Sequence, residues 1–149
     1  DPADFERILA TNITGVFNVA QACANHMIRR RSGKIVNIAS VQTACARKGI
    51  APYTASKGAV GNLTRGMAAD WAQYGIQANA LAPGYFETPL NKALIDDPSF
   101  NAWLTARTPA ARWGRLEELV GACVFLASDA SSFVNGHVLY VDGALTAAL

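Results

Sequence analysis

The sequence predicts an α/β fold in which a parallel sheet carries helices on both faces. Apolar runs of strand length at residues 34–39, 76–82 and 138–141 alternate with longer segments of helical periodicity. The run at 34–39 is mostly apolar and does not alternate strictly, which is typical of a parallel strand buried on both faces. The order helix, strand, helix, strand, irregular segment, helix, strand therefore favours βαβ units.

The first helix is expected from residue 4 to about residue 30. Asp1 and Asp4 are its candidate N-caps, and Pro2 suits an opening turn. Ser32-Gly33 is expected to end this helix. Its apolar stripe, at spacings of three and four, comprises Phe5, Ile8, Leu9, Ile13, Val16, Phe17, Ala20, Ala24, Met27 and Ile28.

The second helix is expected from about residue 52 to residue 74, with Gly75 as its C-terminal stop. The strand at 76–82 follows and ends at Pro83-Gly84. The apolar stripe of this helix comprises Tyr53, Val60, Thr64, Met67, Ala68 and Trp71.

Residues 85–114 are expected to be irregular, with short helical pieces near 88–96 and 99–107. An irregular segment of this length inside a compact domain is usually functional, and it suggests a lid over a site. A third helix at 115–127 precedes the last strand, which Asp142-Gly143 ends in a turn.

Length and composition predict a single domain over residues 1–149. Hydrophobic residues make up 51% of the chain and charged residues 16%, which suffices for a core and argues against disorder. The net charge of +2 argues against nucleic acid or a membrane surface as a partner. We expect no signal peptide and no membrane-spanning segment.

Cysteine and histidine usage bears on compartment and metals. Cys23, Cys45 and Cys123 are scattered and form no C-x-x-C motif, which predicts reduced thiols and a cytoplasmic location. His26 and His137 have no metal-ligand spacing, so no metal site is expected.

Tyr53 and Lys57 lie four residues apart in the second helix, so their side chains share one face. A lysine on the apolar face loses hydration unless another group compensates. Its ammonium group beside a phenol favours the phenolate, which makes a general acid or base that works near neutral pH. The alternative is a surface pair whose spacing has arisen by chance.

Ser40 directly follows the first strand, and Asn12 lies on the apolar stripe of the first helix. Ligands of open parallel sheets bind beyond the carboxyl ends of the strands, where a hydroxyl can stabilise a substrate oxygen. A buried amide must find hydrogen-bond partners. The alternatives are a serine that caps loop backbone and an amide that locks the helix to a neighbour.

Pro83-Gly84 and Thr88 follow the second strand. A glycine lets backbone approach a flat ligand closely, and a proline stiffens the turn. Thr88 and the backbone amides near Phe86 are candidates for binding a carboxamide. An ordinary strand-ending turn is the alternative.

Together these residues resemble the short-chain dehydrogenase/reductase family. Ser40 followed by Tyr53-Thr-Ala-Ser-Lys57 resembles its Ser and Tyr-x-x-x-Lys signature. Asn12, within the sequence TNITGVF, resembles its fourth catalytic residue.

Three further segments extend this resemblance over essentially all 149 residues. Residues 79–84 (NALAPG), with Thr88, are similar to the family's nicotinamide-side motif. Residues 125–129 (FLASD) and 136–143 (GHVLYVDG) resemble its last helix and last strand.

The resemblance implies an oxidoreductase that interconverts a secondary alcohol and a ketone with NAD or NADP. Tyr53 would be the general acid or base, Lys57 would favour its ionisation and hold the nicotinamide ribose, and Ser40 would orient the substrate oxygen. Asn12 would anchor a water that relays protons to Lys57. The expected cofactor contacts are Tyr53, Lys57, Pro83, Gly84, Phe86 and Thr88.

The resemblance also implies the C-terminal portion of a doubly wound Rossmann-type parallel sheet. The family's glycine-rich dinucleotide-binding loop and its residue that selects NAD or NADP have no counterpart in the sequence. We therefore expect the last three of seven strands with flanking helices, and the N-terminal half absent. An alternative of another class is a catalytically silent truncated fragment that acts only as an association unit, because the free edge of strand 34–39 invites pairing.

Three segments suggest the substrate and partners. The gluconate 5-dehydrogenase branch is resembled by residues 107–114 (RTPAARWG), 133–142 (FVNGHVLYVD) and 83–88 (PGYFET), which implies a sugar acid, polyol or related ketone. Arg107 or Arg112 is a candidate for binding a carboxylate, with a surface arginine as the alternative. A 3-oxoacyl-carrier-protein reductase is the near alternative. The family also implies a homodimer or homotetramer.

Overall fold

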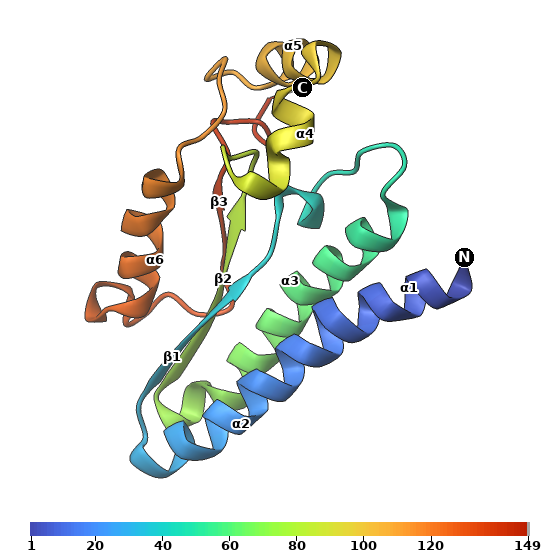
Figure 1. Cartoon of the computed structure of the whole chain (residues 1–149). Coiled ribbons are helices and arrows are strands. Elements are labelled where there is room, and N and C mark those ends of the chain that lie inside the picture. The colour runs from blue at the N-terminus through green and yellow to red at the C-terminus, as the bar shows by residue number, and fades with distance from the viewer. Residues whose placement is uncertain (149) are drawn as a thin grey trace.

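A three-stranded parallel sheet forms the centre of the computed structural model, which describes residues 1–148 (Figure 1). The strands are β1 (Gly33–Ile38), β2 (Ile76–Pro83) and β3 (Val138–Val141), in the spatial order β1-β2-β3. Both pairs are parallel. This confirms the predicted α/β class and all three predicted strands within about one residue.

The first helical segment runs without a break but contains a π-helical turn. It runs through α1 (Pro2–Leu9), the π turn Ala10–Thr14 and α2 (Gly15–Arg30). The Asp1 carboxylate caps it by accepting a hydrogen bond of 3.0 Å from the amide of Ala3. The predicted cap is therefore confirmed for Asp1, whereas periodicity alone gave no sign of the π turn.

The end of α2 differs from the prediction. Arg31, with φ at 54°, is the left-handed residue that ends the helix, and Gly33 already belongs to β1. Gly33 has another reason to be glycine, because a Cβ there would lie 2.6 Å from Cγ of Met27. The predicted stop at Ser32-Gly33 was thus wrong, because the turn that ends the helix is made by Arg31.

The second long helix is α3 (Ala51–Trp71), followed by a 3₁₀ turn at Ala72–Tyr74. Gly75 ends it in the left-handed region at φ 75°, as predicted. A Cβ on Gly75 would lie 2.5 Å from the carbonyl oxygen of Arg31, so this close contact between two helix ends requires glycine.

Helices cover both faces of the sheet (Figure 1). The helices α2 and α3 pack on one face, and α6 (Val120–Ala127) packs on the other. The central strand β2 presents small alanines to these layers, which lets α3 approach closely. The residues buried between α2, α3 and the sheet include Ala20, Ile35, Val60, Met67, Ala68, Ile76, Ala78 and Ala80.

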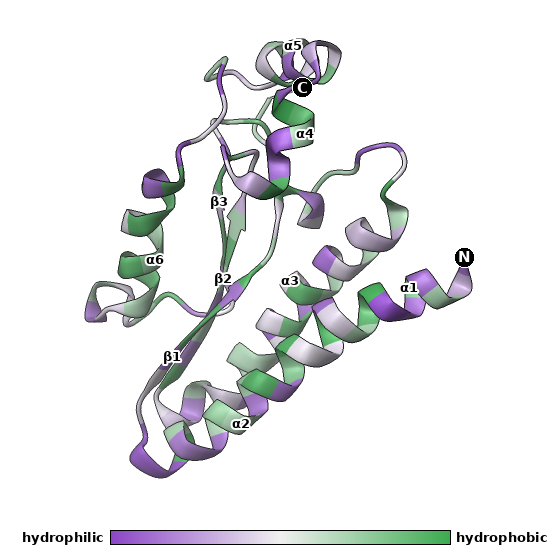
Figure 2. Ribbon diagram, viewed as in Figure 1, coloured by the Kyte–Doolittle hydropathy of each residue, from purple (hydrophilic) through white to green (hydrophobic). Residues whose placement is uncertain are grey.

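The apolar stripe of the first helix is buried only in part. Ala20 and Ala24 are its buried members, whereas Phe5 is 41% exposed and Phe17 39%. Figure 2 shows this apolar colouring along α1 and α2. Part of the predicted core-facing stripe therefore lies on the surface of the chain.

The segment after β2 forms a cap beyond the carboxyl ends of the strands (Figure 1). It contains α4 (Lys92–Ile95) and α5 (Pro98–Arg107), as predicted. A 3₁₀ turn at Leu116–Leu119 then opens into α6, so the expected helix at 115–127 is α-helical only in its second half. A separate cluster of Val41, Leu104, Trp113 and Leu145 packs this cap onto the sheet end.

Among residues 1–148, no helix combines the length and apolarity that a membrane crossing requires. The three cysteines are free thiols. Within the same described range, no three His, Cys, Asp or Glu side chains group as metal ligands.

Candidate active site

The candidate site lies at the carboxyl end of β1, where the chain passes into α3. Ser40 stands two residues beyond the strand, and Tyr53 and Lys57 occupy the first two turns of α3. The loop between them begins with a 3₁₀ turn at Val41–Thr43. The fold thus brings the three predicted residues to one end of the sheet.

Hydrogen bonds tie this 3₁₀ turn to the start of α3. The hydroxyl of Ser40 accepts a bond of 3.2 Å from the amide of Gln42, which makes Ser40 the cap of the turn. The side-chain oxygen of Gln42 accepts a bond of 3.1 Å from Thr54, and Thr43 donates one of 3.1 Å to the carbonyl of Lys57. These bonds hold Ser40 in register with the helix turn that carries Tyr53.

Lys57 links the helix directly to the strand. Its ammonium group donates a bond of 2.8 Å to the carbonyl of Ile38, the last residue of β1. The same nitrogen lies 5.6 Å from the ring centroid of Tyr53. Burial lowers the pKa of Lys57 below its ordinary value of 10.5, because desolvation disfavours the charged form.

Tyr53 remains accessible, with 36% of its surface exposed. Its ring therefore lies beside a partly desolvated cation while still open to a ligand. The exposed phenol beside the Lys57 ammonium can exchange a proton with a bound ligand.

Asn12 contacts α3 through Ser56. The amide nitrogen of Asn12 donates a bond of 3.0 Å to the hydroxyl of Ser56, which in turn donates 2.7 Å to the carbonyl of Tyr53. Ser56 is fully buried. This contact locks the first helix to its neighbour, as the structural alternative for Asn12 expected.

A groove of about 570 Å³ between α2 and β1 joins Asn12 to the candidate site. Asn12 and Lys57 both line it, together with backbone and side chains of residues 34–38. The groove leaves room beside Lys57 for water, so the proton-relay role expected of Asn12 is compatible with its position.

Gly84, which follows β2, lies where close packing requires a glycine. A Cβ on Gly84 would lie 2.8 Å from Cα of Asp142, so the turn after β3 explains the glycine without a ligand. The ring of Phe86 is buried against Gly114, where a Cβ would come within 2.5 Å of the ring. Pro83 pairs with Val141 at the end of the sheet.

Thr88 is different from these neighbours. Its hydroxyl oxygen is buried and has no hydrogen-bond partner within residues 1–148. A buried hydroxyl without a partner costs free energy, so Thr88 fits the expectation of a residue that binds a polar ligand group such as a carboxamide.

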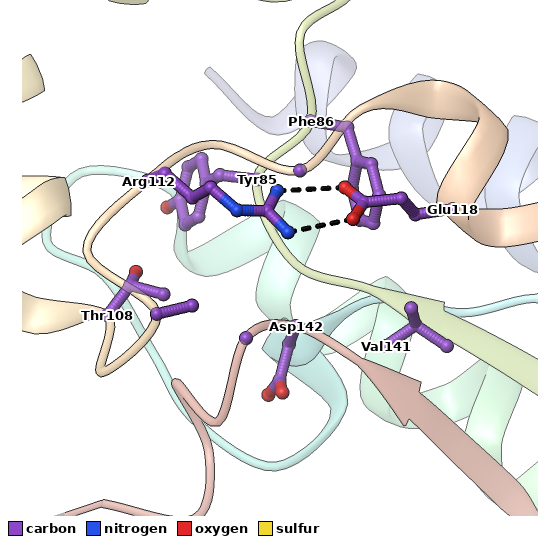
Figure 3. A pocket seen from close by; sticks show the side chains of 10 residues that line it. Tyr85, Phe86, Thr108, Arg112, Glu118, Val141 and Asp142 are labelled. Atoms are coloured by element: carbon purple, nitrogen blue, oxygen red, sulfur yellow. Dashed lines mark hydrogen bonds and ion pairs between the residues drawn. The ribbon is translucent and has the colours of Figure 1, made fainter.

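The two arginines predicted to bind a carboxylate are already engaged. Arg112 makes two hydrogen bonds, of 2.8 and 2.7 Å, to the carboxylate of Glu118 beside a pocket of about 110 Å³ (Figure 3). Arg107 donates a bond of 3.2 Å to the carbonyl of Ala148. In this arrangement Arg112 serves an intramolecular ion pair, and Arg107 holds the C-terminal turn.

Sequence analysis missed Arg47, which lies in the loop between Ser40 and Tyr53. Its Nε is buried and has no hydrogen-bond partner within residues 1–148. Its guanidinium carbon lies 5.3 Å from the ring centroid of Phe100 in α5. Its position between two site residues was the signal that could have drawn attention to it.

The chain matches known proteins along nearly its whole length. Residues 1–146 match the family described as enoyl-(acyl carrier protein) reductase. Gluconate 5-dehydrogenase of Gluconobacter oxydans strain 621H is 61% identical over 146 residues, which cover 98% of this chain and 57% of that protein. The 5-keto-D-gluconate 5-reductase of Escherichia coli strain K12 is 53% identical, over 98% of this chain and 58% of that protein.

A solved structure is equally similar. The crystal structure of a gluconate 5-dehydrogenase from Burkholderia cenocepacia J2315, in complex with NADP and tartrate, has a TM-score of 0.98 at 63% identity. It is matched over 100% of this chain and 58% of that chain. The chain thus spans a little more than half the length of these relatives. With its parallel sheet, its Ser, Tyr and Lys at one sheet end and these matches, the chain belongs to the short-chain dehydrogenase/reductase family.

Proposed function

We propose that the chain is the catalytic portion of an NAD(P)-dependent oxidoreductase that interconverts a sugar acid of the gluconate type and its keto form. One observation carries the chemistry: the Lys57 ammonium, bonded to the end of β1, lies 5.6 Å from the ring centroid of Tyr53. The similarity to proteins named gluconate 5-dehydrogenase and 5-keto-D-gluconate 5-reductase supports the substrate class.

The proposed roles follow from the position of each side chain. Tyr53 exchanges the proton of the substrate hydroxyl, and Lys57 stabilises the phenolate that results. Ser40 donates a hydrogen bond to the substrate oxygen as negative charge develops there and keeps its own proton. Asn12 holds water in the groove beside Lys57, through which protons return to solvent. The four residues together make up the proposed catalytic set.

The cofactor assignment rests on residues around Thr88. A bound nicotinamide cofactor supplies the hydride acceptor or donor. Thr88, with its unpaired buried hydroxyl, and the backbone near Phe86 would hold the carboxamide, and Tyr53 and Lys57 would contact the ribose. Pro83 and Gly84 would shape the backbone beside the ring. The relative from Burkholderia cenocepacia that holds NADP supports NAD or NADP as the class of cofactor.

The proposal includes an assembly and a compartment. Exposed apolar side chains on α1 and α2, such as Phe5, Phe17 and Val19, suit a buried contact in a homodimer or homotetramer. Free thiols at Cys23, Cys45 and Cys123 suit a cytoplasmic location.

A substrate panel on the full-length gene product tests the proposal. Gluconate, 5-ketogluconate and a 3-oxoacyl ester are each assayed with NAD(H) and NADP(H), following absorbance of the reduced cofactor. We expect the highest kcat/KM with the gluconate and 5-ketogluconate pair. A clear preference for the 3-oxoacyl ester would contradict the sugar-acid assignment and favour an acyl-carrier-protein reductase.

A further inference from the structure

Arg47 lies on the loop that carries the candidate site. The backbone amide of Arg47 donates a bond of 3.2 Å to the side-chain oxygen of Gln42, which also accepts the bond from Thr54. Gln42 is buried, and through these bonds it fixes the backbone of Arg47 relative to both Ser40 and Tyr53. A guanidinium group is thus held within the loop that spans the two residues proposed to act on the substrate oxygen.

The side chain of Arg47 packs against Phe100 of α5 and has no anionic partner within residues 1–148. Its guanidinium carbon lies 5.3 Å from the ring centroid of Phe100, and its Nε is buried and unbonded. The ion pairs among residues 1–148 use Arg7, Arg112, Arg115 and Lys92, and not Arg47. The half-buried guanidinium hydrogen-bonds the phenol of Tyr85 but has no ion-pair partner within residues 1–148, which favours an anionic ligand.

Tyr85 is a neutral hydrogen-bond partner of Arg47. Burial raises the pKa of the Tyr85 phenol, and negative charge on Cys45 and on Tyr53 acts in the same direction. The positive charge of Arg47 and a hydrogen bond from its side chain act against this rise. The Arg47 side chain therefore lies against the hydroxyl of Tyr85. That ring also packs edge-on against Trp113, at 5.8 Å between centroids.

We propose that Arg47 binds the carboxylate of the substrate, as the anionic partner that its guanidinium lacks within residues 1–148. The inference rests on the proposed function and adds the residue that distinguishes an acid from a neutral sugar. A planar guanidinium pairs bidentately with a carboxylate, and Phe100 holds its plane in place. The substrate then extends from Arg47 at its acid end to Tyr53 and Ser40 at its reacting carbon. Arg112 is excluded from this role by its ion pair with Glu118, and Arg107 is bonded to the carbonyl of Ala148 at the C-terminal turn.

Arg47→Ala, Arg47→Lys and the control Lys48→Ala, an exposed neighbour, test this assignment in the full-length gene product. We expect Arg47→Ala to raise KM for 5-ketogluconate on the order of 100-fold, with kcat changed by less than about threefold. Arg47→Lys recovers part of the loss, because a lysine keeps the charge but not the bidentate geometry. Lys48→Ala leaves both constants unchanged.

Calorimetric titration provides a readout that needs no turnover. Gluconate and the neutral polyol sorbitol are titrated into the wild type and Arg47→Ala, whose melting temperatures are compared to verify folding. Loss of gluconate binding in Arg47→Ala, with sorbitol binding unaltered, supports the assignment. An equal gluconate affinity or KM in both proteins overturns it. A wild type that neither binds nor turns over gluconate or 5-ketogluconate contradicts the proposed function itself.

Discussion

Asn12 donates its amide proton to the hydroxyl of Ser56, and Ser56 donates in turn to the carbonyl of Tyr53. This chain of two bonds joins the π turn Ala10–Thr14 to the helix turn of the proposed acid/base. A π turn inserts one residue and rotates the following side chains, and such turns are frequent at functional sites. The geometry of the first helix is therefore coupled to the position of Tyr53.

A double-mutant cycle measures this coupling. Asn12→Leu and Ser56→Ala each remove one partner of the same part-buried bond. We expect each variant to lower the free energy of unfolding by about 1–2 kcal/mol, with a coupling energy of about 1 kcal/mol. Urea denaturation of the two single variants and the double variant gives the values. Strict additivity would show that the bond contributes nothing to stability.

Replacing the phenol of Tyr53 tests its proposed role. Tyr53→Phe keeps the ring that lies beside Lys57 and removes the exchangeable proton. We expect kcat to fall by about 10²- to 10⁴-fold, with little change in melting temperature. Steady-state kinetics and thermal unfolding of the same preparation separate the two effects. Activity retained within tenfold would assign the acid/base to another group.

Local patterns predicted the elements because strand and helix periodicity are properties of neighbouring residues. The three strands, the long helices and the stop at Gly75 followed from such patterns. The parallel connection of β1 to α3 also placed Ser40, Tyr53 and Lys57 at one sheet end. Their catalytic roles stay predictions.

The features that the sequence did not reveal depend on contacts between distant residues. The π turn contains Asn12, whose amide bonds a partner 44 residues away. Gly84 is explained by Asp142, which approaches it only once β2 and β3 are paired. Arg47 stands out because, within residues 1–148, it forms no ion pair and its Nε is buried without a hydrogen bond, and burial is a property of the folded chain.

Lys57 makes stability depend on pH in the alkaline range. Its pKa is lowered by burial, so the folded state binds this proton less tightly than the unfolded chain does. The free energy of unfolding therefore rises with pH from the lowered pKa up to about 10.5. We expect the wild type to gain stability relative to Lys57→Met between pH 7.5 and pH 10 in urea denaturation. If the free energies of unfolding of the two proteins kept a constant difference over this pH range, the lowered pKa of Lys57 would be contradicted.

Glu118 makes the free energy of unfolding depend on pH in the acid range. Hydrogen bonds from Arg112 and from the amide of Arg115 lower its pKa to about 2, from an ordinary value of 4.5. The stabilisation is complete above pH 4.5 and is lost as pH falls toward 2. We expect Glu118→Gln to be less stable than the wild type at pH 6, and this difference to shrink by pH 3. The exposed neighbour variant Glu117→Gln serves as the control, and an undiminished Glu118→Gln difference at pH 3 would rule out the ion pair as its source.

Gly84 and Gly66 form a matched pair for testing the packing of the cap. A Cβ on Gly84 would lie 2.8 Å from backbone Cα of Asp142, whereas a Cβ on Gly66, in α3, meets nothing within 4 Å. We expect Gly84→Ala to destabilise the fold by about 1–3 kcal/mol, because the β2 and β3 ends must separate. Gly66→Ala should stabilise it by about 0.5–1 kcal/mol, through the higher helix propensity of alanine. Thermal and urea unfolding compare the two directly. A Gly84→Ala variant as stable as the wild type would show that the close approach of Asp142 does not require the glycine. The approach of a flat ligand to the backbone would then be the better explanation for Gly84.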